Sequence, residues 1–372
     1  MLKKRSHNSY VTFLLLCCCL FLFACQSGSN NADERTVPPD KSENISLTPL
    51  DIQYESFQKV IGWLTEEEIL IHVGNTEGHE LLTHNIFSGE KNTIYTEKTS
   101  ILSVKINQSR DKILLQEVSE TLSRLTVITT DGLTVQTTPF DYSSYVTLDW
   151  NPTDNNTVFI SHYSFDQVTE SEMIHVYVWT IDENTLTTRD IPSLSPKWYS
   201  ANVYLYIDEL HTDALYIGDI REDREDMLLN MDISDFFLSE DTFLGIVESD
   251  IQDNLVHLFH EYPFLVGDKV LSIPKVTIND YPVKPHLTQA TRNGRIYGVI
   301  PEYSFALEED LGNFSLSYLD FENEEIKEVM ELPEDAPIAL SPSEDYLLYG
   351  WRLEYIITLS EPRMIPLLEE FD

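Results

Sequence analysis

The chain has 372 residues, with 24 Lys and Arg against 63 Asp and Glu, which gives a formal net charge of −39 at pH 7. This charge repels nucleic acid and anionic lipid headgroups, so we expect no nucleic-acid partner. It favours solubility and leaves cations and basic protein or cell-envelope partners as the charged ligands to consider. We interpret the acidity chiefly as a means of keeping a surface protein dispersed.

The N-terminus has the layout of a secretory signal peptide. Three positive residues, Lys3, Lys4 and Arg5, precede an apolar run over Val11–Ala24. That run is shorter than the roughly 20 residues of a membrane-spanning helix, so we predict a cleaved signal over residues 1–24 rather than a permanent transmembrane helix.

The end of the run, Leu22-Phe23-Ala24-Cys25, resembles the lipobox of bacterial lipoproteins. The resemblance implies that the Cys25 thiol accepts a diacylglycerol group carrying fatty acids such as palmitate, and that cleavage falls between Ala24 and Cys25. Phe23 departs from the pattern, because that position usually holds a smaller residue. The alternative is an ordinary secretion signal with an incidental cysteine.

Residues 25–46 have no apolar period and are rich in Ser, Asn, Pro and charged residues, which predicts a flexible tether. We expect the folded domain over residues 47–372, at the extracytoplasmic face of the cell membrane, with the diacylglycerol anchor as the membrane contact. Because the cysteines upstream of Cys25 would leave with the signal, this domain would contain no disulfide.

Short segments rich in β-branched and aromatic residues follow one another along the folded part. Ile101–Ile106, Lys112–Val118 and Ile174–Thr180 are typical, and turn residues separate them. This pattern predicts strands and an all-β fold. Two charged stretches, Arg221–Met227 and Asp232–Phe237, are the candidates for helix.

A strand–turn–strand unit recurs: an apolar or aromatic residue, a polar turn, then a run of large β-forming residues. The clear units cover Gly62–Val73, Lys105–Gln116, Leu148–Ser161, Pro196–Ile207 and Ile338–Trp351, and a weaker one covers Thr288–Pro301. Several continue into a second pair of strands, and four strands in about 45 residues make one blade of a β-propeller. We therefore predict six blades, and the long interval before Thr288 leaves a seventh blade within Thr212–Pro285 as an alternative.

Together with the lipobox and the tether, this order of features resembles the YqgU-like β-propeller lipoproteins of Gram-positive bacteria over the whole chain. The resemblance implies a six-bladed propeller. It implies no established activity and gives no catalytic residues to carry over.

Two pairs of histidines call for comparison with metal sites. His79 and His84 resemble part of a zincin motif, but their spacing on a predicted strand places the two rings on opposite faces. His257 and His260 would approach each other only on a helix. We interpret both pairs as ordinary surface or partly buried histidines.

Two segments, Asp182–Thr185 and Pro152–Asn156, could offer oxygen ligands to calcium, but neither has the residue order of a calcium loop. The sequence contains no nucleophile elbow and no phosphate-binding loop. We therefore assign no catalytic and no metal-ligating residues and expect no cofactor, with calcium as the open alternative.

Four tryptophans recur at comparable places near the hairpin turns: Trp63, Trp150, Trp198 and Trp351. A ring of tryptophans could line a binding mouth. Repeated use of one residue type in one position instead favours wedges between blades, which is the interpretation we adopt.

Both ends of the folded domain carry strand patterns, at Asp51–Val60 and Tyr355–Ser360. Neither end shows four complete strands of its own. We therefore predict that the two ends share a sheet or lie in adjacent sheets, and so close the ring.

These features predict a membrane-anchored lipoprotein that acts as a non-enzymatic binding or scaffold module, with an unidentified ligand. Propellers bind at the channel mouth or on the rim, where loops converge. The alternative is an extracytoplasmic hydrolase or lactonase-like enzyme with a carboxylate or calcium site in the channel. Three or more inward-facing carboxylates close together would favour the enzyme.

Overall fold

The structure consists of antiparallel β-sheets connected by turns. The computed structural model describes residues 46–368, except 121–122, 144, 167–170, 213, 223, 232, 240–241, 250 and 261–268. Over these residues the chain forms no helix, and so none that is long and apolar enough to cross a membrane. The predicted all-β class is confirmed.

The described strands form seven four-stranded sheets, which we number 1–7 in chain order. Sheet 1 contains β1 (Phe57–Trp63), β2 (Glu68–Asn75), β3 (Gly78–Asn85) and β4 (Lys91–Glu97), and sheet 2 contains β5 (Ser100–Ile106), β6 (Lys112–Val118), β7 (Ser123–Thr129) and β8 (Thr134–Pro139). Sheet 3 contains β9 (Val146–Trp150), β10 (Thr157–Asp166), β11 (Ser171–Thr180) and β12 (Thr185–Arg189), and sheet 4 contains β13 (Lys197–Trp198), β14 (Val203–Ile207), β15 (Leu215–Asp219) and β16 (Met227–Asn230). Sheet 5 contains β17 (Asp235–Ser239), β18 (Thr242–Glu248), β19 (Leu255–His260) and β20 (Lys269–Pro274), and sheet 6 contains β23 (Leu287–Gln289), β24 (Ile296–Pro301), β26 (Phe314–Asp320) and β27 (Glu325–Leu332). Sheet 7 contains β28 (Ile338–Leu340), β29 (Tyr346–Tyr349), β30 (Tyr355–Thr358) and β31 (Arg363–Pro366).

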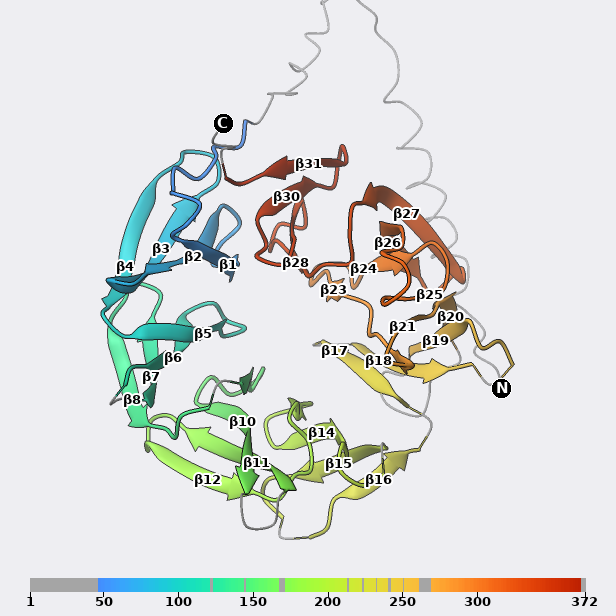
Figure 1. Ribbon diagram of the computed structural model, residues 1–372, viewed down its shortest axis with the longest axis horizontal. Helices are drawn as coiled ribbons and strands as arrows, with labels where there is room; N and C mark the ends of the chain where they lie inside the picture. The colour runs from blue at the N-terminus through green and yellow to red at the C-terminus, as the bar shows by residue number, and fades with distance from the viewer. Residues whose placement is uncertain are drawn as a thin grey trace, which may run out of the picture. The chain divides into compact units, whose positions relative to one another are not determined.

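The sheets follow one another around a common centre, with β1, β5, β17, β23 and β28 innermost (Figure 1). This arrangement confirms the β-propeller. Sheet 5 lies within the interval Thr212–Pro285 that the sequence analysis left open for a seventh blade. The structure therefore has one four-stranded sheet more than the repeat units alone indicated.

Two expectations about local structure differ from what the chain forms. The helix candidates Arg221–Met227 and Asp232–Phe237 are wrong: Met227 begins β16 and Asp235 begins β17.

A smaller three-stranded sheet joins two connections that flank β23 and β24. It contains β21 (Val276–Ile278), β22 (Tyr281–Pro282) and β25 (Phe305–Ala306).

Each sheet buries both of its faces against its neighbours. On β2, Ile69 and Ile71 belong to the core shared with sheet 7, whereas Leu70 between them belongs to the core shared with sheet 2. Seven such clusters occur among the described residues, one for each pair of neighbouring sheets. Because successive side chains on a strand point to opposite faces, an unbroken apolar run fills two of these cores at once.

Sheets 1 and 7 close the ring as neighbours. The indole Nε1 of Trp63 donates to the carbonyl of Ala339 at 3.0 Å, and the Val60 amide donates to the Arg352 carbonyl at 2.9 Å. The prediction that the chain ends lie in adjacent sheets is confirmed. Its stated reason is wrong, because each end forms a complete four-stranded sheet of its own.

The segment before β1 strengthens this closure. The Leu50 amide donates to the Leu367 carbonyl at 2.6 Å, and Leu50 forms an isolated parallel bridge with Leu368. The Leu50 side chain is fully buried in the cluster that joins sheets 1 and 7. Residues before the first strand and after the last strand thus share one core.

We expect Leu50→Ala to lower the free energy of unfolding by about 2–5 kcal/mol, because it leaves a cavity where the chain ends meet. Urea unfolding of the variant and the parent measures the difference. Leu133→Ala is the control: this side chain is 65% exposed, so its loss should change stability by no more than about 0.5 kcal/mol. Equal effects of the two substitutions would contradict the role of Leu50 in closure.

Candidate functional site

The turns that follow the innermost strands gather at one end of the propeller. In a four-stranded meander, the first and third turns lie at one end of the sheet and the second lies at the other. Contacts between sheets agree with this placement. Arg292, after β23, donates to Glu66 of sheet 1 at 2.9 Å, and Asn155 of sheet 3 donates to Ser109 of sheet 2 at 2.6 Å.

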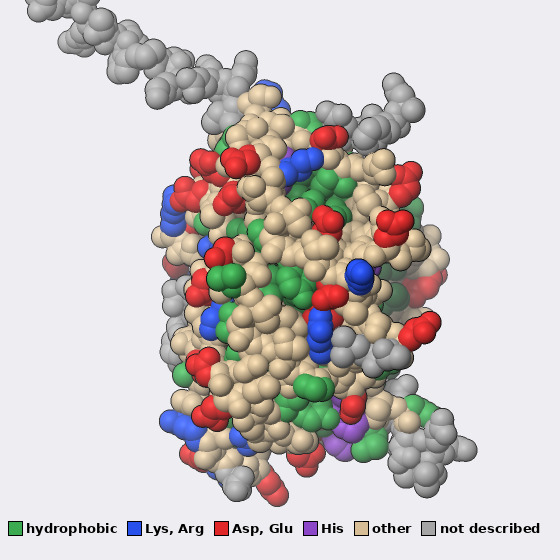
Figure 2. Space-filling model, turned by 90° about the vertical axis from the view of Figure 1, so that its left-hand side faces the viewer, with side chains coloured by type: hydrophobic (Ala, Val, Ile, Leu, Met, Phe, Trp, Pro, Cys, Tyr) green, Lys and Arg blue, Asp and Glu red, His purple; other side chains and the backbone are tan. Residues whose placement is uncertain are grey.

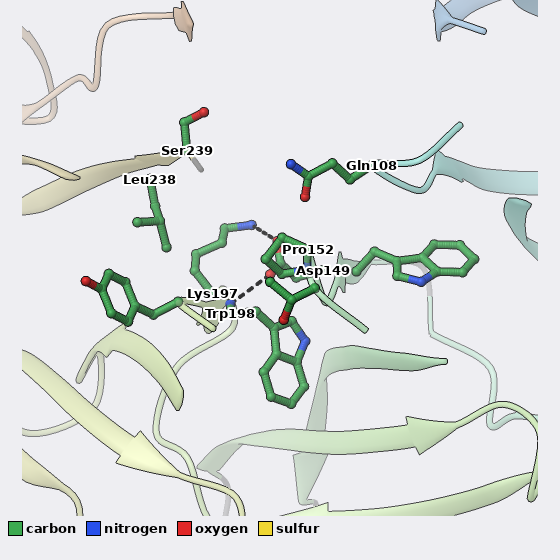
Figure 3. Close-up of a pocket in the computed structure, with 10 residues that line it drawn as sticks. Gln108, Asp149, Pro152, Lys197, Trp198, Leu238 and Ser239 are labelled. Atoms are coloured by element: carbon green, nitrogen blue, oxygen red, sulfur yellow. Dashed lines mark hydrogen bonds and ion pairs between the residues drawn. The ribbon is translucent and has the colours of Figure 1, made fainter. Parts of the chain in front are cut away.

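A cavity of about 500 Å³ lies at this end, between turns of sheets 2, 3, 4 and 5. Its walls mix charged, polar and aromatic side chains. The lining residues are Gln108, Asp149, Trp150, Pro152, Thr153, Lys197, Trp198, Tyr199, Leu238 and Ser239. Gln108 and Leu238 stand on opposite sides of Lys197 (Figure 3).

The cavity residues on the innermost strands occupy equivalent positions. The last two residues are Gly62-Trp63 in β1, Lys105-Ile106 in β5, Asp149-Trp150 in β9 and Lys197-Trp198 in β13. The last residue of each pair packs between sheets. The residue before it has the opposite orientation in the strand, and at Asp149 and Lys197 this places a charged group on the cavity wall.

Asp149 is held by the neighbouring sheet. Its carboxylate accepts hydrogen bonds from Lys197 Nζ at 2.8 Å and from the Trp198 amide at 3.0 Å (Figure 3). Burial by itself would lower the pKa of Lys197, but the Asp149 carboxylate outweighs that effect and raises the pKa. Lys197 therefore stays charged, and the two contacts of Asp149 fix the relative positions of β9 and β13 at the cavity.

Two further lysines lie on innermost strands, Lys59 on β1 and Lys105 on β5, and both are exposed. Desolvation lowers the pKa of Lys105, and the charge of Lys197 lowers it further. Among the described residues, neither Lys59 nor Lys105 forms an ion pair with a carboxylate. Sequence reasoning missed the Asp149–Lys197 pair, although the residue before the tryptophan at the end of β9 and of β13 was the available signal.

The tryptophans act mainly as wedges between sheets. Trp198 is 2% exposed and stacks on Phe159 of sheet 3 at 4.1 Å between ring centroids, and Trp63 reaches Ala339 of sheet 7. Trp351 does not match this position. It follows β29, at the opposite end of the blade, and is 60% exposed.

The histidine candidates lie on strands. His79 and His84 are both on β3, but their partners differ: His79 Nδ1 lies 2.8 Å from His72 Nε2, and His84 Nε2 lies 3.1 Å from the Thr48 carbonyl. His72, which contacts His79, is a histidine that the sequence motifs did not indicate.

The second histidine pair is likewise separated. His257 and His260 lie on β19, where His257 Nδ1 contacts Ser272 Oγ at 2.9 Å and the His260 ring packs beside Phe321. The strand therefore lacks the helical turn that would have brought the two histidines together.

The two calcium candidates adjoin each other. The Asp182 amide donates to Asn156 Oδ1 at 2.8 Å, and the Asp154 carboxylate accepts from the Asn156 amide and the Thr157 hydroxyl. In the part of the chain that the structure describes, no group of three or more His, Cys, Asp or Glu side chains is placed to hold a metal. Calcium binding stays a prediction.

One other titratable pair stands out. Burial raises the pKa of Asp335 to about 6, with a contribution from Glu334, and Asp335 Oδ1 lies 3.8 Å from His286 Nε2. The cavity beside Asp335 measures only about 10 Å³. A cavity of this size has no room for a substrate, so the larger cavity is the better candidate site.

The predicted lipidation and cleavage at Ala24 and Cys25, the signal peptide and most of the tether lie outside the described residues. The domain boundaries at residues 24 and 46 stay predictions.

The fold and the cavity define the class of protein: it is an all-β propeller with a cavity where its turns converge. A family model described as the YqgU-like 6-bladed beta propeller domain matches residues 85–350. The chain therefore belongs to the YqgU-like β-propeller family. The family description counts six blades, and the described part of this chain contains seven four-stranded sheets.

Individual relatives agree with this assignment. The chain is 24% identical over 365 residues to the uncharacterized lipoprotein YqgU of Bacillus subtilis (strain 168), covering 94% of each protein. The crystal structure of uncharacterized protein lmo1340 from Listeria monocytogenes EGD-e matches with a TM-score of 0.77 at 20% identity, covering 87% of this chain and 98% of that one. Oligogalacturonate lyase from Vibrio parahaemolyticus matches with a TM-score of 0.58 at 11% identity, covering 83% and 91%, which shows a shared fold alone.

The His72–His79 contact generates a prediction about acid stability. Burial lowers the pKa of His72 to about 4, with smaller contributions from the charges of His79 and Lys59. Between about pH 6.5 and 4 the unfolded chain therefore binds more protons than the folded chain, and stability falls as the pH falls. We expect this residue to cost about 2 kcal/mol by pH 5.

His72→Phe should remove that cost and flatten the decline in unfolding free energy between about pH 7 and 5. Urea unfolding at several pH values measures it. Leu133→Ala, which changes an exposed side chain that does not titrate, should leave the decline unchanged. A decline that is equally steep in wild type and His72→Phe would contradict the assignment.

Proposed function

We propose that the protein is a non-enzymatic binding or scaffold module, held at the extracytoplasmic face of the cell membrane by a diacylglycerol group on Cys25. The observation that carries the binding role is the cavity of about 500 Å³ where turns of four sheets converge. Its volume falls in the range of about 300–1,000 Å³ typical of small-molecule sites.

The internal pairing of the cavity carboxylate supports binding rather than proton transfer. Asp149 already accepts two hydrogen bonds, and its charge is balanced by Lys197. Asp235, the other carboxylate on an innermost strand, pairs with Lys284 at 2.9 Å. The alternative enzyme would use a carboxylate or calcium site in the channel, and both carboxylates on the described innermost strands are already paired with lysines.

The location is supported by the lipobox at Leu22–Cys25 and by the lipoprotein name of the Bacillus relative. Acyl chains contribute about 0.8 kcal/mol per buried methylene, and two chains give stable anchoring. A tether would leave the propeller free to meet a ligand or partner near the membrane surface.

Cys25→Ala should release the protein from the membrane or leave it uncleaved, because the thiol is the proposed acceptor of the lipid. Membrane fractionation and the apparent mass of the protein measure the two outcomes. Ser27→Ala, two residues along, is the matched control and should fractionate like the parent. A Cys25→Ala protein that is processed and retained like the parent would contradict lipidation.

A photo-crosslinking residue in place of Gln108 tests binding at the cavity. We expect a discrete adduct in the cells that make the protein, because this side chain faces the cavity at its mouth. The same residue in place of Ile326, on the outermost strand β27, should not form that adduct. Mass spectrometry compares the two, and an identical adduct pattern at both positions would argue against a ligand in the cavity.

A further inference from the structure

We infer that the hairpin of β10 and β11 binds a copper(I) ion through His162, His175 and Met173. The site is separate from the cavity, because Trp150 of the cavity wall pairs with Val158 whereas His162 lies at the other end of β9. The inference is independent of the proposed binding function. It follows from the strand register, from the hydrogen bonds of the two histidines and from the chemistry of the three donor groups.

The strand register brings the three side chains to one face of the hairpin. His162 on β10 is directly opposite His175 on β11, and Ser164 is directly opposite Met173. Residues two apart on a strand share a face, and directly opposite residues share it as well, so these four side chains form one group. Directly opposite residues have Cβ atoms about 4.5–5.5 Å apart, and diagonal neighbours are within reach of a long side chain such as methionine.

Contacts within the group agree with this placement. The rings of His162 and His175 have centroids 5.1 Å apart and planes inclined by 28°. Ser164 Oγ lies 2.6 Å from His175 Nε2, so side chains at diagonal positions of the hairpin do meet. The two imidazoles therefore lie close enough together to share one ion after small rotations of their side chains.

His162 has the hydrogen-bonding state of a metal ligand. Its Nδ1 lies 3.1 Å from the Tyr163 carbonyl, which can only accept, so Nδ1 donates the proton and Nε2 bears the lone pair. Metal-ligating histidines commonly donate their other ring N–H to a backbone carbonyl in this way. Nε2 of His162 is buried and has no hydrogen-bond partner among the described residues, and the whole residue is 5% exposed.

A buried acceptor without a partner costs free energy, and a metal ion bound at Nε2 would remove that cost. The imidazole also has the required charge, because burial lowers the pKa of His162 and keeps the ring neutral at pH 7. The neutral ring is the form that ligates metals.

The donor set selects the metal. Two imidazole nitrogens alone would suit zinc, copper or nickel, whereas a thioether sulfur is a soft ligand that favours copper(I). Met173 supplies that sulfur and is 43% exposed on the same face as the histidines. Calcium, which takes oxygen ligands, does not fit this group.

The position of the group allows an ion to reach it. β9 pairs with β10 only as far as His162, and β12 pairs with β11 only from Val176 onward, so the part of the hairpin that carries Ser164 and Met173 extends beyond its neighbours in the sheet. Acidic side chains are spread over the side of the molecule shown in Figure 2, and the whole chain has a formal charge of −39. Such a surface attracts cations.

The test uses the full-length protein purified from membranes in a neutral detergent, with its thiols alkylated. Copper(I), kept reduced with ascorbate under anaerobic conditions, is titrated in competition with the chromophoric chelator bicinchoninate. We expect the parent to take one equivalent of copper(I) from the chelator. Because every variant keeps the same cysteines, a difference between variants reports on the hairpin alone.

Met173→Leu and His175→Gln should each weaken copper(I) binding by about tenfold or more, because each removes one of three ligands. Met227→Leu and His79→Gln are the matched controls and should bind like the parent. Met227 is an exposed methionine on β16, and His79 contacts another histidine from a strand. Equal thermal melting of the variants would show that the fold is intact.

X-ray absorption at the copper edge tests the site without any substitution. The copper(I)-loaded parent should show both nitrogen and sulfur neighbours, and nitrogen alone would overturn the three-residue site. Copper(I) binding that is equal in the parent, Met173→Leu and His175→Gln would overturn it as well. Zinc bound as tightly as copper(I) would overturn the choice of metal. None of these outcomes affects the adduct at position 108, so the proposed function is tested separately.

Discussion

The burial of both faces of every sheet is the constraint on which the rest of this structure depends. On β2, Ile69 and Ile71 fill one core while Leu70 fills the next, so no sheet can be removed without exposing apolar surface on two neighbours. Such sheets are stable only in a closed series. The contact between sheets 7 and 1, made by Trp63, Leu50 and their partners, is therefore a condition of stability for the whole ring.

The hairpins after the innermost strands were predictable because a polar turn separates an aromatic or apolar residue from a long apolar strand. The sequence supports sheet 5 only as an alternative seventh blade, because its first hairpin has a two-residue connection between Ser239 and Thr242 and begins at charged Asp235. The charge at the start of β17 favoured a helix by composition, and pairing with β18 overrode it. The four strands of the C-terminal sheet were also hard to recognise from the sequence, since β30 and β31 have only four residues each.

The candidate site was less predictable than the fold. Asp149 and Lys197 are 48 residues apart, and each belongs to a separate sheet, so only the closed ring brings them together. Periodicity identifies the residues that pack, such as Trp150 and Trp198, because the same requirement recurs in each blade. Periodicity does not identify a functional residue whose type differs from one blade to the next. Trp351 shows the opposite error: the same residue type, placed after β29, has no packing role of this kind.

The end of each innermost strand combines a packing position with a functional one. The last residue of β1, β5, β9 and β13 is Trp or Ile, because it must fill space between sheets. The residue before it is Gly62, Lys105, Asp149 or Lys197, so the four sheets differ in side-chain size and charge at this position. This residue points away from the core that the last residue fills, so packing between sheets does not fix its type. The same ring of sheets can therefore keep its architecture while the chemistry of its cavity changes, one blade at a time.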